Sequence, residues 1–115
     1  MNDIEHNSTD EALEALKTKL NRDTAKINWS ALQEHHQKEA VIRVENSQDL
    51  VTVAGEFVQD NHSQVKEWLD QGAIAKVGIE RGQQWLEDDI ELWAVVVAPW
   101  ILGQEISQDA KPDNN

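Results

Sequence analysis

The most concrete candidate for chemistry is a group of four acidic side chains close together in the sequence. They are Glu87, Asp88, Asp89 and Glu91, directly before a long apolar run. Mg²⁺ and Ca²⁺ prefer oxygen ligands, so this stretch could hold a divalent metal. It lacks the spacing and the central glycine of a calcium loop, and charge blocks are usually solvated. We therefore expect a solvated turn at 87–91 that protects the apolar run from aggregation, with a metal site as the weaker alternative.

The residue types that usually carry catalysis form no recognisable pattern. His35 and His36 are adjacent, so on a helix they point about 100° apart and cannot easily bind one ion. There is no cysteine, and four serines stand at predicted helix starts, where capping explains them. The five glycines form neither a P-loop nor a dinucleotide fingerprint. We predict no catalytic residue and no cofactor, and the residues leave open whether the chain is an enzyme.

Tryptophan is the most informative residue type, with five copies beside one phenylalanine and no tyrosine. Tryptophan is highly buried on average, so we expect most of the five to fill the core. It is also enriched in binding hot spots, so one or two could be partly exposed and contact a partner. The two candidates are Trp100, which follows a proline at the end of a predicted strand, and Trp29, which precedes a predicted helix start.

Length and charge limit the class of protein. The chain has 115 residues and a formal net charge of −12, which fits one domain and argues against direct nucleic-acid binding. The absence of cysteine excludes a disulfide scaffold, a thiol enzyme and a zinc ribbon. The N-terminus has no signal-peptide pattern, and the longest apolar run, at 92–102, is too short to cross a membrane. We expect a cytoplasmic protein that binds no membrane.

Apolar periodicity predicts five helices and three strands in one domain over 8–103. The helices are expected near 9–21, 30–38, 50–58, 63–71 and 79–86, and the strands at 40–44, 73–77 and 92–98. The polar ends, 1–7 and 104–115, are predicted to be disordered tails.

This element order favours an α+β fold with a small sheet of three to four strands and about five helices mainly on one face. The run at 92–98 has no alternation. That is typical of a strand buried on both faces, so we expect this last strand to be the central one.

The C-terminal segment Glu91-Leu-Trp-Ala-Val-Val-Val-Ala-Pro-Trp100 resembles the signature of a family of small, acidic bacterial proteins classed as a domain of unknown function. Segments at 24–32, 49–54 and 65–72 are also similar to that family, so the resemblance covers about residues 13–104. Glu39 differs, because the family is expected to carry a glycine at this helix-to-strand turn. The resemblance implies a compact cytoplasmic domain, with no established activity, cofactor or site residues.

Three functions fit these observations. We favour a non-catalytic protein-interaction or regulatory module, either monomeric or a homodimer, in which an apolar patch ringed by acids meets a basic protein. The alternatives are a small enzyme with a metal at 87–91 and an acidic mimic of nucleic acid.

Overall fold

The computed structural model describes the backbone of residues 2–106 and the side chains of residues 11–106. Its elements are α1 (Asn2–Asp23), β1 (Ala25–Asn28), a 3-10 helix η1 (Trp29–Leu32), α2 (Gln33–Gln37), β2 (Val41–Val44), α3 (Leu50–Val58), α4 (His62–Gln71), β3 (Ile74–Lys76), α5 (Ile79–Asp88), β4 (Glu91–Val97) and β5 (Trp100–Glu105). The predicted α+β class is confirmed.

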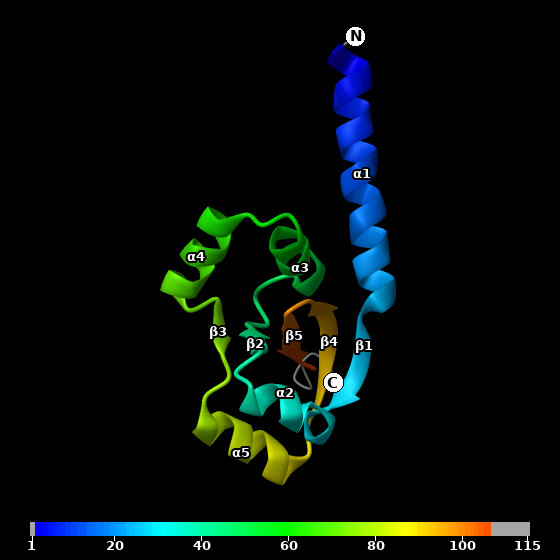
Figure 1. Cartoon of the computed structure of the whole chain (residues 1–115). Helices are drawn as coiled ribbons and strands as arrows, with labels where there is room; N and C mark the ends of the chain where they lie inside the picture. The colour runs from blue at the N-terminus through cyan, green and yellow to red at the C-terminus, as the bar shows by residue number, and fades with distance from the viewer. Residues whose placement is uncertain (1, 107–115) are drawn as a thin grey trace, which may run out of the picture.

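All five strands form one mixed sheet, with the order β1-β4-β5-β2-β3 (Figure 1). The pair β2–β5 is parallel, and the other neighbours are antiparallel. The prediction of three to four strands is too low because it missed β1 and β5. Pro99 ends β4, as a residue without an N–H should, but the chain turns back at once and Trp100 begins β5. The central strand is therefore β5, while β4 is interior and second from the edge.

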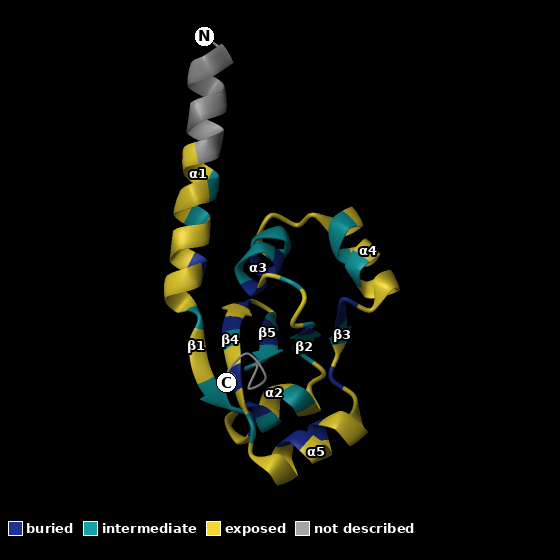
Figure 2. Ribbon diagram, turned by 180° about the vertical axis from the view of Figure 1, so that it is seen from behind, coloured by how far each residue is buried: buried dark blue, intermediate teal, exposed yellow. Residues whose placement is uncertain are grey.

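Helices cover both faces of this sheet, so the expectation that they lie mainly on one face is wrong. Successive strand residues point to opposite faces, and neighbours such as Val41 and Ile42 belong to different core clusters. The cluster that we call the α3 cluster comprises Leu20, Ile42, Val44, Leu50, Val53, Ala54, Ile74, Val95, Val97 and Leu102. The Trp29 cluster comprises Trp29, Leu32, Val41, Val77, Trp85, Leu92 and Ile101. Figure 2 shows buried residues on both α3 and α5, which lie on these two faces.

Strand β4 is buried in part only. Leu92 and Val95 are inaccessible on opposite faces, but Trp93 is 38% exposed and Val96 is 65% exposed. The helices of each face cover one end of the strand: Leu92 packs in the Trp29 cluster, and Val95 and Val97 pack in the α3 cluster. The predicted burial on both faces is thus correct for Leu92 and Val95 and wrong for Trp93 and Val96.

Several helix starts use other residues than the serines expected there. The side chains of Asp49 and Asn61 accept the capping bonds of α3 and α4, from the backbone N–H groups of Thr52 and Gln64. Asp and Asn side chains are strong N-caps. At the other end of α4, Gly72 adopts the predicted left-handed conformation with φ of 79°.

The regular elements extend beyond the predicted domain limits. Helix α1 begins at Asn2 rather than Ser8, and its N-terminal part extends away from the rest of the molecule (Figure 1). Gln104 and Glu105, expected in the C-terminal tail, are paired in β5. The remainder of that predicted tail, from residue 107 onward, lies outside the described residues. Within residues 2–106, no helix has the length and apolar character needed to cross a membrane.

Candidate functional site

The four acidic residues proposed as a metal alternative do not form one turn. Glu87 and Asp88 end α5, Asp89 is its left-handed C-cap, and Glu91 begins β4. All four are exposed, and the Asp89 carboxylate accepts a 3.4 Å hydrogen bond from the Asn28 amide. Among residues 11–106, no three His, Cys, Asp or Glu side chains gather as a metal site would require. The acids are therefore solvated at the end of α5 and at the start of β4.

Trp29, one of the two candidate partner-binding residues, is completely buried. Its indole N–H donates a 2.8 Å hydrogen bond to the Gly82 carbonyl oxygen. Its ring centre lies 5.1 Å from that of Trp85, in an edge-to-face arrangement, and 4.9 Å from that of His36. The prediction that Trp29 could be exposed is wrong, because α5 closes over it.

His36 helps to close this cluster. Its Nε2 lies 3.1 Å from the carbonyl oxygen of Val77, a contact that requires the hydrogen on Nε2. Its ring also lies against Gly82, where an added Cβ would sit only 2.6 Å from His36 Cε1. Glycine at 82 thus allows the helix backbone to reach both Trp29 and His36. The contacts assign His36 a structural role within the Trp29 cluster.

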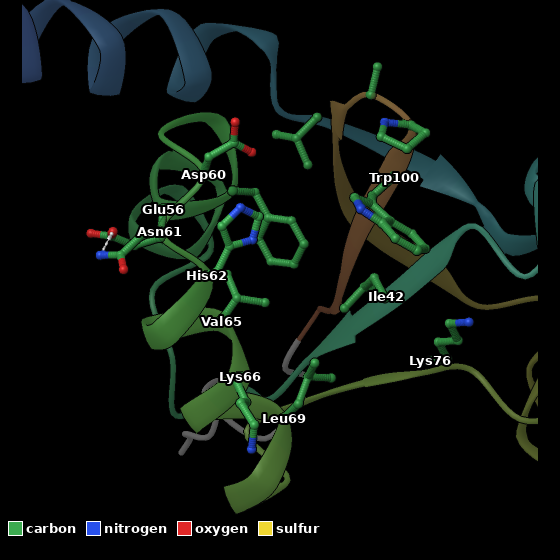
Figure 3. Close-up of a pocket in the computed structure, with 14 residues that line it drawn as sticks. Ile42, Glu56, Asp60, Asn61, His62, Val65, Lys66, Leu69, Lys76 and Trp100 are labelled. Carbon is green, nitrogen blue, oxygen red and sulfur yellow. Dashed lines mark hydrogen bonds between the residues drawn. The ribbon is translucent and has the colours of Figure 1, made fainter.

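Trp100, the other candidate, is half-buried and lines an open groove of about 360 Å³. We call this hollow the Trp100 groove; α3 and α4 form one side, and the β4–β5 turn and the start of β5 form the other (Figure 3). Its apolar lining includes Ile42, Phe57, Val65, Leu69, Val97, Pro99 and Trp100. Leu69 is 46% exposed, so the groove presents apolar side chains to solvent.

Charged and polar side chains surround this apolar lining. Figure 3 shows Asp60 at the edge of the groove and Glu56 next to Asn61, with its carboxylate directed away from Trp100, whereas Lys66 on α4 and Lys76 on β3 lie at separate places on the other side. The Glu56 carboxylate accepts a 2.7 Å hydrogen bond from the side-chain amide of Asn61. No basic side chain among the described residues lies within ion-pair distance of Glu56 or Asp60. This end of the groove is therefore negative.

The two lysines at the other end have acidic partners. Lys66 lies 2.9 Å from Asp70, and Lys76 lies 3.7 Å from Glu39. The hydrogen bond and the charge of Asp70 raise the pKa of Lys66 above its usual value. The Lys76 ammonium also lies 5.8 Å from the centre of the Trp100 ring, a cation–π contact. The positive charges at this end are thus balanced within the protein.

A second hollow, of about 440 Å³, adjoins the Trp100 groove on the α1 side of the β4–β5 turn. The two hollows share Phe57, Asp60, Val97 and Ala98, and the second one adds Leu16, Val58 and Val96. Val58 and Val96 are exposed. An apolar strip therefore continues from the groove towards α1.

Sequence patterns indicated part of this groove. The predicted helical face of Val65, Trp68 and Leu69 exists, and Val65 and Leu69 line the groove. Glu56 and Asp60 were missed because an isolated acid on a helix or just after it carries no signal in a single sequence. Their significance comes from the β4–β5 turn, which brings Trp100 opposite the end of α3.

These features define a small mixed α+β domain, with one sheet between two layers of helices and an open apolar groove at one end. The chain matches the family described as "Protein of unknown function (DUF2288)" over residues 15–105, and it belongs to this family. The resemblance found in the sequence is thereby confirmed.

The chain is also similar to PA1075 from Pseudomonas aeruginosa, whose solution structure was determined by NMR. The two are 40% identical, the match covers 84% of this chain and 90% of that chain, and the TM-score is 0.73. No curated protein matches the chain. The relatives therefore support the fold and the family.

Proposed function

We propose that this domain is a non-catalytic protein-interaction module that binds a basic partner protein through the Trp100 groove. The observation that carries the proposal is an accessible tryptophan in an apolar hollow whose edge carries two acids, Glu56 and Asp60, that form no ion pair with any residue that the structure describes. Protein interfaces commonly combine a hydrophobic centre with a polar rim, and tryptophan is frequent among the residues that contribute most to binding. The described residues combine these features around Trp100.

Charge favours a basic partner over a second copy of the chain. Two copies would each carry a formal charge of −12 and would repel one another. A basic protein would be attracted instead, and its association would be faster at low ionic strength. Glu56 and Asp60 would then meet its cations at the edge of the apolar contact.

The substitution Trp100→Ala tests this proposal, with Trp93→Ala as the matched control. Both tryptophans are partly exposed and both have a lysine near the ring, at 5.8 Å for Lys76–Trp100 and 5.4 Å for Lys26–Trp93. Only Trp100 lines the groove. Partners captured on the wild-type chain are purified, and their affinities for both variants are measured by calorimetry.

We expect one partner whose affinity falls by about 30-fold or more in Trp100→Ala, the loss typical of a binding hot spot. Trp93→Ala should bind it within about twofold of the wild type, because rim and distant residues contribute little. Equal binding by both variants would contradict the proposal. A partner affinity that is unchanged in Trp100→Ala but falls steeply as the salt concentration rises would favour the nucleic-acid mimic.

The metal alternative predicts a different result. Titration with Mg²⁺ or Mn²⁺ would then change the backbone amide resonances around Asp88 and Asp89 selectively. Such a response at millimolar metal concentration would support the alternative function, an enzyme with a metal site at 87–91.

A further inference from the structure

The two ends of the Trp100 groove differ in the charge that they offer a ligand. The lysines at one end already contact Asp70 and Glu39, so an anion would have to compete with these carboxylates. At the other end, Glu56 and Asp60 line the groove without a basic partner among the described residues. A cationic group of a ligand could therefore form a new ion pair at the α3 end of the groove, where no basic side chain among the described residues competes with it.

Glu56 lies near the C-terminal end of α3, and Asp60 follows shortly after that helix. Glu56 is half-buried at the end of α3, and the Asn61 amide fixes its Oε1 through a 2.7 Å hydrogen bond. Asp60 follows the helix in a left-handed conformation with φ of 57°, which Asp tolerates better than most residues. Asn61 in turn caps α4 through its side chain. Both acids thus occupy a short segment whose backbone and side chains bond to one another.

The size of the hollow limits what can enter it. A volume of about 360 Å³ lies near the lower end of the range of about 300–1,000 Å³ found for ligand pockets. This space suits a short chain segment that inserts one or two side chains. The apolar walls, formed by Val65, Leu69 and Trp100, favour a bulky apolar side chain there.

We infer that the groove binds a short peptide segment in which a bulky apolar side chain is followed or preceded closely by Lys or Arg. The apolar side chain lies between Trp100 and Leu69, and the cation pairs with Glu56 and Asp60. This inference rests on the proposed function and specifies the recognition element of the partner. Charge complementarity selects this occupant over an acidic peptide and over a second copy of a chain with a net charge of −12.

A random peptide library displayed on phage tests the inference directly. The full chain is immobilised, and peptides that also bind the Trp100→Ala variant are removed. The enriched peptides are synthesised with a fluorescent label, and their affinities are measured by anisotropy. We expect enriched sequences with a large aliphatic or aromatic residue within four positions of Lys or Arg.

The double variant Glu56→Gln plus Asp60→Asn then tests the carboxylates. Gln keeps an acceptor for the Asn61 amide, and Asn tolerates the left-handed conformation at 60. Each removed charge should weaken binding by about two- to fivefold, as for exposed ion pairs. Glu67→Gln plus Asp88→Asn is the control: it makes the same change in net charge with two exposed acids that do not line the groove, and it should leave affinity unchanged.

Three results would overturn the inference, and they separate it from the proposed function. Enriched peptides that lack basic residues but still need Trp100 would refute the ligand class and leave the interaction module intact. Equal loss in the two double variants would show a general charge effect and refute the pairing with Glu56 and Asp60. Failure to enrich any peptide dependent on Trp100 would contradict both the inference and the groove as the binding surface.

Discussion

Each face of the sheet carries a tryptophan within or beside an apolar cluster. Helices cover the tryptophan completely on one face only. On one face, Trp29 is inaccessible, and its indole N–H is bonded to the Gly82 carbonyl oxygen. On the other, Trp100 is partly exposed at the edge of a groove, and the described residues provide no hydrogen-bond acceptor for its indole. The same residue type thus serves as core on one face and as accessible surface on the other.

The difference comes from the helix that lies opposite each tryptophan. Gly82 allows α5 to approach until its backbone contacts both Trp29 and His36. At the open site, α4 presents Val65 and Leu69 across a gap instead of closing over Trp100 (Figure 3). Gly82 is thus the position that allows close packing on one face, whereas the other face leaves apolar side chains accessible to solvent.

The largest change in the free energy of unfolding should come from replacing each of the two tryptophans by alanine. Trp29→Ala should lower the free energy of unfolding by about 3–5 kcal/mol, because it leaves a large cavity and removes the buried hydrogen bond to the Gly82 carbonyl. Trp100→Ala should lower it by about 1–2 kcal/mol, because its side chain is already partly in water. Urea denaturation of the purified variants measures both. Equal losses would show that the two clusters do not differ in closure.

A sharper test concerns the glycine that allows closure. Gly82→Ala should destabilise the protein by about 1–2 kcal/mol, since the new Cβ meets the His36 ring. In the His36→Ala background the same change should become stabilising, by up to about 1 kcal/mol, because Ala favours the helix. Thermal or urea denaturation of the four proteins gives the coupling between the two sites.

Gly55 in α3 is the matched control for this cycle. The nearest neighbour of a Cβ at 55 is Leu20 Cδ1 at 4.0 Å, an ordinary contact. Gly55→Ala should therefore stabilise the protein by about 0.5–1 kcal/mol. A Gly82→Ala variant as stable as Gly55→Ala would contradict the proposed close approach of α5.

The smallest change in the free energy of unfolding is expected at the turn between α2 and β2. Glu39 has a positive φ of 59°, at the position where the family resemblance leads us to expect glycine. Glu39→Gly should raise the free energy of unfolding by about 0.5–1 kcal/mol, because it relieves the left-handed strain and loses only an exposed ion pair with Lys76. Asp60→Gly should gain less, because Asp tolerates this conformation better. A loss of stability in Glu39→Gly would show that the side-chain contacts of Glu39 stabilise the fold by more than its backbone strain costs.

Apolar periodicity was sufficient to predict most elements and the α+β class. The stripes of α3 and α4 and the alternation of β2 are local patterns, and each was found where predicted within a few residues. The strands β1 and β5 were missed for a physical reason. They are recognised through pairing with β4, which a single sequence does not display.

The candidate site could be predicted only in part, since burial of a tryptophan depends on distant segments. Trp100 was one of the two candidates for partial exposure and is half-buried in the structure, at the start of β5 rather than at the end of a strand. Trp29 was misjudged because the helix that covers it begins fifty residues later, at Ile79. The acids Glu56 and Asp60 become significant only through tertiary contact with the β4–β5 turn.

The indole N–H resonances of the five tryptophans can show whether a ligand binds beside Trp100 and not beside Trp29. They can be assigned with single Trp→Phe variants and followed in ¹H–¹⁵N spectra while a library-selected peptide is added. We predict that the Trp100 resonance shifts in step with binding, while that of Trp29, bonded to Gly82, stays in place. A shift at Trp29 or Trp93 with no change at Trp100 would contradict it.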